Sequence, residues 1–221
     1  MPHEVFDRTE TESSGTELSA AAYNLVIGLV LLWGFGLNWY MVKTIPVERL
    51  LEIRPLFFFG GYFLLAFGGV FLFRKSSSPF LSFIGYNMVA VPFGAVINIV
   101  VAGYDSHIVL EAIQLTGGVT LVMMLLGTLF PVFFSRIAGA LTIALLAVIL
   151  VELANMFFFK KDIPALDWVV AVIFCGYIGY DWGRANQIPK TLDNAIDSAA
   201  SLYMDIINLF LRILRILGRR R

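Results

Sequence analysis

Long apolar stretches alternate with short polar ones along nearly the whole chain after residue 19. A bilayer core about 30 Å thick is crossed by about 20 apolar residues, at ~1.5 Å per residue. Seven stretches approach or exceed this length, and charges or turn residues bound each of them. They cover residues 19–42, 55–73, 80–103, 108–134, 136–159, 168–182 and 192–217. The pattern predicts an all-α membrane protein with seven transmembrane helices.

The composition favours the same class of protein. Hydrophobic residues make up 59% of the 221 residues and charged ones only 14%, whereas a soluble domain carries roughly 25% charged residues. The net charge is zero, so no overall basic field points to nucleic acid as a partner. We expect three parts: a disordered acidic tail over residues 1–19, a seven-helix domain over 20–218 and a basic end over 219–221.

The ends of the chain and its few reactive side chains exclude several functions. The tail has no apolar run after a basic start, so it does not resemble a signal peptide. Cys175 is the single cysteine and lies inside an apolar run, which excludes an intrachain disulfide. His3 and His107 lie outside the predicted spans. We therefore expect no cofactor and no cysteine or histidine metal centre.

We expect the lipid bilayer to be the main partner of the chain. The distribution of lysines and arginines predicts the orientation of the chain in that bilayer. Seven spans place the two termini on opposite sides. More Lys and Arg lie in the loops on the C-terminal side than on the other, which favours a cytoplasmic C-terminus. The short loops are typical of a bacterial plasma-membrane protein, and we expect a monomer.

The seventh stretch is unlike the others because polar residues recur along it. They are Asp193, Asp197, Ser201, Asp205 and Asn208. Helical spacing places most of them on one broad face. An aspartate at the bilayer centre costs several kcal/mol unless it faces protein or water. We expect this helix to be central, ringed by the other six; the alternative is an amphipathic helix flat on the membrane surface.

Asp181 near the end of the sixth span is the matching feature. On its own it reads as an interfacial carboxylate paired with Arg184. The short loop after it folds the sixth and seventh helices antiparallel, so Asp181 and Asp205 can meet. Two close carboxylates in a low dielectric hold one proton between them and titrate as a unit. Such a pair can sense pH, or it can bind Ca²⁺ as a metal site, in competition with protons.

The C-terminal stretch resembles the Bax inhibitor family, the transmembrane Bax inhibitor motif proteins. The resemblance rests on Tyr180-Asp181, on Leu-Tyr-Met-Asp-Ile-Ile-Asn-Leu-Phe over 202–210 and on Leu-Arg-Ile-Leu-Gly over 214–218. Val-Leu-Glu-Ala over 109–112, Gly127-Thr128 and Asn155 also fit. The likeness reaches from about residue 70 to the end of the chain.

The resemblance implies a pH-sensitive calcium leak through a seven-helix fold whose last helix is central. It implies that Asp181 and Asp205 form the pH sensor. A basic residue at the end of the second helix locks the closed state in such proteins, and Arg74 holds that position. Relatives can carry an acidic residue within the second helix, but residues 57–63 have none. The open-state partner of Arg74 and the direction of pH gating therefore stay open.

Four further polar residues are candidates to line a path through the membrane: Glu111, Glu152, Asn155 and Asn208. For Glu152 the alternative is a hydrogen-bonded structural role.

Two other functions compete with a leak. Tyr180-Asp181 resembles the first motif of intramembrane aspartyl proteases. However, the second motif of these proteases is Gly-x-Gly-Asp, and Gly-x-Gly is missing before Asp205. Pro164-Ala165-Leu166 resembles their third motif, but it precedes both aspartates instead of following them. We therefore expect no enzyme. Relatives also regulate membrane partners, including membrane proteases and cell-death proteins, and the sequence is compatible with such a membrane protein partner.

Overall fold

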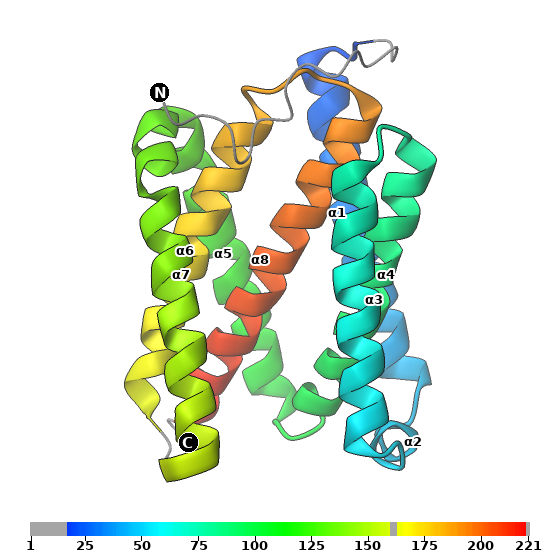
Figure 1. Cartoon of the computed structure of the whole chain (residues 1–221), viewed down its shortest axis with the longest axis vertical. Coiled ribbons are helices and arrows are strands. Elements are labelled where there is room, and N and C mark those ends of the chain that lie inside the picture. The colour runs from blue at the N-terminus through cyan, green and yellow to red at the C-terminus, as the bar shows by residue number, and fades with distance from the viewer. Residues whose placement is uncertain (1–16, 160–162, 220–221) are drawn as a thin grey trace.

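The computed structural model of the chain describes residues 17–159 and 163–219. These residues form helices joined by short connections (Figure 1). In chain order the elements are α1 (Ala20–Thr44), α2 (Val47–Leu51), α3 (Pro55–Lys75), α4 (Pro79–Val101), α5 (Ser106–Leu129), α6 (Pro131–Ala154), the π-helical turn η1 (Asn155–Phe159), α7 (Pro164–Ala185) and α8 (Leu192–Gly218). Most of the predicted acidic tail and the last two residues of the predicted basic end lie outside the described part.

Six of these helices are long and apolar enough to cross a membrane: α1, α3, α4, α5, α6 continued by η1, and α7. They correspond to the first six predicted stretches. The predicted boundary between the fourth and fifth stretches, at residues 134–136, was wrong because α6 already begins at Pro131. Proline suits the first position of a helix, since its missing N–H would have no partner there. The short helix α2 was not predicted.

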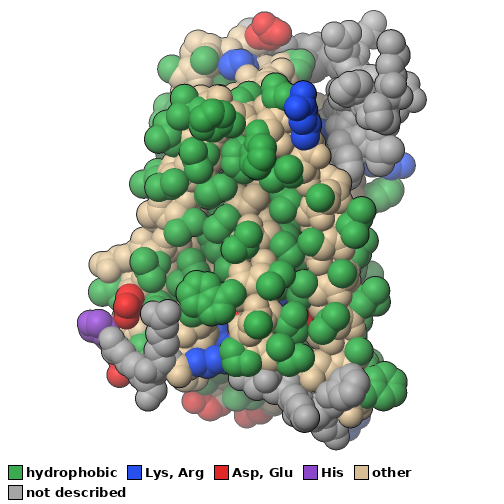
Figure 2. Space-filling model, turned by 90° about the vertical axis from the view of Figure 1, so that its left-hand side faces the viewer, with side chains coloured by type: hydrophobic (Ala, Val, Ile, Leu, Met, Phe, Trp, Pro, Cys, Tyr) green, Lys and Arg blue, Asp and Glu red, His purple; other side chains and the backbone are tan. Residues whose placement is uncertain are grey.

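The outward faces of α3 and α6 show that this is an integral membrane protein. Among the residues of α3 only Gly69 and Phe73 are buried, and in α6 only Phe134 and Val148. Figure 2 shows hydrophobic side chains covering the middle of one face, with charged side chains towards its two ends. An apolar surface this continuous is typical of contact with lipid rather than water.

Helix α8 differs from the six spans in polarity and position. It runs obliquely between α1, α3 and α4 on one side and α5, α6 and α7 on the other (Figure 1). It packs mainly against α1, α4, α5 and α7, and Leu202, Leu209 and Leu214 are fully buried. Helices α3 and α6 pack mainly on α4 and α7. A complete ring of six helices around a seventh span thus stays a prediction.

Two pairs of glycines bring helix backbones into direct contact. A side-chain carbon at Gly127 of α5 would overlap the carbonyl oxygen of Gly179 of α7. One at Gly69 of α3 would overlap the carbonyl oxygen of Gly85 of α4. Small residues of this kind permit the close helix approach found in membrane proteins. The first contact holds α7 in place two residues before Asp181.

Candidate functional site

The two aspartates singled out by the sequence meet where α7 packs against α8. Asp181 lies in the last two turns of α7 and Asp205 near the middle of α8. Their side chains are hydrogen-bonded to each other. Asp205 is only 7% exposed, and Asp181 is half-buried. Because an ionised carboxylate can only accept hydrogen bonds, a bond between these two side chains requires one proton on the pair.

The pair has few other polar neighbours. The Oδ2 atom of Asp205 is buried, and apart from the Asp181 side chain no hydrogen-bond partner for it lies within the described part of the chain. A buried polar atom that loses its partner costs about 1–3 kcal/mol, so the contact with Asp181 matters for the placement of Asp205.

Two arginines act on this pair electrostatically. Arg184 follows Asp181 by one helical turn, and the exposed Arg74 ends α3; both charges interact with Asp181. The neighbouring Lys75 instead lies over the ring of Phe71, 4.9 Å from its centroid. The structure therefore brings Asp181 and Asp205 into contact, and it places the charge of Arg74 within electrostatic reach of Asp181.

The other predicted residues do not join the pair. Glu111 is half-buried on α5. Asn208 donates a hydrogen bond to the carbonyl oxygen of Met204, at 2.7 Å within α8. Glu152 and Asn155 lie where α6 passes into η1, beside a separate cavity. Their predicted role in lining a path stays a prediction.

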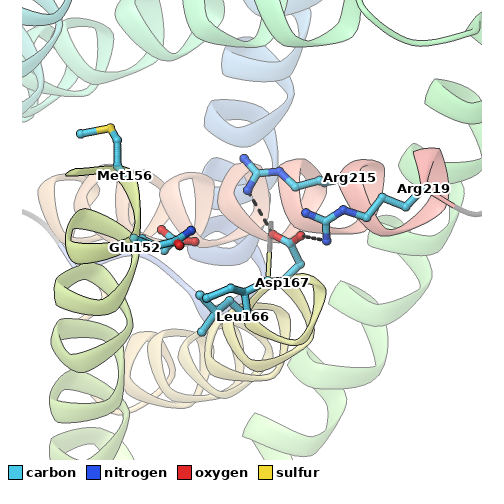
Figure 3. Close-up of a pocket in the computed structure, with 8 residues that line it drawn as sticks. Glu152, Met156, Leu166, Asp167, Arg215 and Arg219 are labelled. Carbon is cyan, nitrogen blue, oxygen red and sulfur yellow. Dashed lines mark hydrogen bonds and ion pairs between the residues drawn. The ribbon is translucent and has the colours of Figure 1, made fainter. Parts of the chain in front are cut away.

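A cluster of ion pairs at the far end of α7 was not predicted from the sequence. We call it the arginine cluster; it consists of Glu152, Asp167, Arg212, Arg215 and Arg219. Arg212 donates to Glu152 at 2.6 and 3.1 Å and to Asp167 at 2.9 Å. Arg215 and Arg219 also donate to Asp167 (Figure 3). Asp167 is buried in the first turn of α7, so a single carboxylate holds three guanidinium groups.

The sequence carries a signal for this cluster. Residues 212, 215 and 219 follow each other at spacings of three and four, which places them on one face of a helix. The predicted sixth span begins at residue 168, which places Asp167 in a loop outside it, so the prediction gives these arginines no acidic partner on that helix. The signal is the helical spacing of the three arginines together with the acidic residue Asp167 at the start of α7.

The described residues contain no group of three or more His, Cys, Asp or Glu side chains placed to hold a metal ion. Ca²⁺ usually takes six to eight oxygen ligands, roughly. The aspartate pair supplies two carboxylates, fewer oxygens than such an ion needs.

Comparison with known proteins identifies the family to which these residues belong. The sequence model of the family described as "Inhibitor of apoptosis-promoting Bax1" matches residues 17–221. This chain belongs to the Bax inhibitor family. The resemblance noted in the sequence is thereby confirmed.

Relatives of this Bax inhibitor family chain occur in distant organisms. It is 35% identical over 130 residues to Bax inhibitor 1 of Schizosaccharomyces pombe, an alignment that covers 57% of this chain and 47% of the yeast protein. It is 26% identical over 213 residues to the inner membrane protein YbhL of Escherichia coli, covering 89% and 88%. It is 30% identical over 196 residues to the protein LIFEGUARD 3 of Arabidopsis thaliana, covering 83% and 68%. The chain thus spans about half of the yeast relative and most of the bacterial one.

Proposed function

We propose that this protein is a passive, pH-sensitive calcium leak gated by Asp181 and Asp205. The observation that carries the proposal is the hydrogen bond between these two side chains inside a bundle of membrane helices. In this proposal α8 crosses the bilayer as a seventh, central span ringed by the other six. Its burial against α1, α4, α5 and α7 supports that placement.

The closed state is the one in which the pair holds one proton. The shared proton joins α7 to α8, and the single remaining negative charge faces Arg74 and Arg184. Arg74 thereby draws the end of α3 towards α7. In this state the shared proton joins α7 to α8, and the negative charge of the pair attracts Arg74 at the end of α3.

Leaving the one-proton state in either direction loosens a contact. Loss of the proton creates two negative charges, and two charges ~4 Å apart repel by about 4 kcal/mol at an effective dielectric constant of about 20. Gain of a second proton removes the charge that Arg74 faces. We therefore expect the leak to be smallest where the pair holds one proton and to increase on both sides of that pH range.

Calcium would use the same carboxylates. When the pair is ionised, its oxygens, including Oδ2 of Asp205, become ligands suited to a hard cation. Protons and calcium then compete for one site. Glu111 and Asn208 are our candidates for further oxygens along the path. Glu152 is a weaker candidate because Arg212 already occupies its carboxylate.

The setting proposed for this activity is a bacterial plasma membrane, with the protein as a monomer and its C-terminus in the cytoplasm. The relative YbhL is an inner membrane protein, and the excess of Lys and Arg on the C-terminal side supports the orientation. We assign the aspartates no catalytic role, because the Gly-x-Gly-Asp motif of aspartyl proteases is missing.

The experiment that tests the proposal measures calcium entry into dye-loaded liposomes that hold the purified protein, stepped from pH 8 to pH 6. Wild-type flux should vary with pH, and Asp181→Asn should abolish that variation. Flux that is absent at every pH, from protein shown to be folded, would refute the leak. That result would favour a regulator that binds a membrane protein partner.

A further inference from the structure

A cavity lies beside the arginine cluster, at the end of the bundle where α6 ends and α7 begins (Figure 3). Its volume is about 200 Å³, which is room for several water molecules. Asp167 and Asp181 are separated by about 20 Å along α7, at ~1.5 Å per residue. The cavity is thus distinct from the aspartate pair.

The position of the cavity places it at the level of lipid headgroups. Helices α6 and α7 are both candidate spans, so the end of α6 with η1 and the start of α7 lie at a membrane face. Trp168, next to Asp167 in the chain, is 52% exposed, and tryptophan is enriched where the bilayer meets water. Met156, Ile163 and Leu166 provide an apolar part of the cavity wall.

Among the described residues, the charges at the cavity come from the three arginines and two carboxylates of the cluster. Arg215 and Arg219 line the cavity together with Glu152 and Asp167, and Arg212 donates to both carboxylates without lining it. Asp167 thereby fixes the arginines in place. The nearby helix ends do not change the balance of these charges, because the positive end of α7 and the negative end of α8 carry opposite partial charges of roughly half a unit each.

Arg215 is the arginine best placed to bind a further group. It donates to Asp167 through Nη1 at 3.2 Å, and its side chain is 49% exposed. A guanidinium group has five N–H donors in a planar fork. Arg215 therefore presents donors to the cavity while Asp167 holds its orientation.

We propose that this cavity binds the phosphate group of an anionic phospholipid, with Arg215 as the main donor. Arginine matches phosphate oxygens in a bidentate geometry, and basic pockets between membrane helices are suited to anionic headgroups. The glycerol and first acyl carbons of the lipid would lie against Met156, Ile163 and Leu166. This apolar wall at headgroup depth is why we assign the site to a lipid rather than to free phosphate.

The test counts the lipids that stay bound to the purified full chain in native mass spectrometry. The protein is offered phosphatidylglycerol and phosphatidylcholine with identical acyl chains. Wild-type protein should prefer phosphatidylglycerol, and Arg215→Gln should weaken its binding about tenfold, as expected for the loss of a charged hydrogen bond. Arg49→Gln is the matched control: Arg49 is exposed on α2, at the same end of the molecule (Figure 1), and its replacement should change nothing.

Several results would overturn the proposal. These are equal binding of the two lipids by wild-type protein, or equal binding of phosphatidylglycerol by wild-type protein and Arg215→Gln. Inorganic phosphate that raises the melting temperature through Arg215, without any preference for phosphatidylglycerol, would show a site for free phosphate instead. If Arg215→Gln does not fold, Arg215→Lys decides: it keeps the charge but loses the fork, so it should bind phosphatidylglycerol several-fold more weakly. Undiminished binding by Arg215→Lys would refute the role of the fork.

Discussion

Replacing Asp205 with asparagine would separate charge from hydrogen bonding at the contact between α7 and α8. The two side chains have nearly the same shape. The amide of the asparagine can donate to the Asp181 carboxylate, so the hydrogen bond between the helices is kept. What disappears is the second ionisable group, and with it the repulsion that follows loss of the shared proton.

The size of that repulsion sets the expected effect. Two charges ~4 Å apart repel by about 4 kcal/mol at an effective dielectric constant of about 20, and hydrogen-bonded carboxylates lie closer than that. A tenfold change in a two-state equilibrium needs only ~1.4 kcal/mol. Ionisation of the wild-type pair therefore has enough energy to change the leak at least tenfold. In Asp205→Asn we expect the leak to change less than about twofold between pH 6 and pH 8.

Calcium entry into dye-loaded liposomes measures this directly, with Asp193→Asn as the control. Asp193 is a buried carboxylate in the first turn of α8 that accepts a hydrogen bond from Ser82 at 2.6 Å. It belongs to the same helix but not to the pair, so its replacement should leave the pH profile unchanged. If Asp205→Asn keeps the wild-type pH profile, the pair is not the sensor and the proposed gating is wrong.

Three further replacements test other parts of the structure. Arg74→Ala should raise the calcium leak at neutral pH because the charge facing Asp181 is lost, whereas Lys75→Ala should not; equal leaks would contradict the lock. Asp167→Ala should lower the free energy of unfolding in detergent by about 3–5 kcal/mol, because it leaves three arginines without their shared carboxylate; a loss below ~1 kcal/mol in denaturant titration would show that the cluster does not hold α8. Gly127→Ala should lower the free energy of unfolding by about 1–3 kcal/mol, because the added methyl overlaps the backbone of α7. An unchanged melting temperature would contradict a tight contact between α5 and α7 at this glycine.

The hydropathy of the sequence predicted most helices, and its failures have physical causes. An apolar run continues from α5 into α6 without a polar residue at Phe130 and Pro131, so only the proline marks the boundary. Helix α8, which the apolar pattern predicted as a seventh span, is more polar than the six helices that are apolar enough to cross a membrane. Its aspartates, which made it stand out, also predicted its burial.

The candidate site was predictable to the extent that chain topology fixes which residues meet. A short loop makes α7 and α8 antiparallel, which places Asp181 and Asp205 on neighbouring helices. Asp181 lies four residues before the end of α7 and Asp205 thirteen residues after the start of α8, so the oblique course of α8 (Figure 1) is also needed for them to meet. The arginine cluster needs more information, because Glu152 comes from α6, a third helix. Whether Glu152 faces Arg212 depends on how α6 is rotated about its axis, and its apolar surroundings fit several rotations.

The two charged contacts between α7 and α8 differ in strength, and this difference indicates how the proposed gate would move. At the far end Asp167 is held by three arginines, and Arg212 is held in turn by Glu152. Closer to the middle of α8 only the side-chain contact between Asp181 and Asp205 joins the two helices. A change of pH within the physiological range does not remove the charge of an arginine, whereas in the proposed gate it removes or adds a proton on the pair. The helices should therefore separate first at the aspartates while the arginine cluster remains closed, so that the cluster acts as the fixed end about which α7 and α8 part.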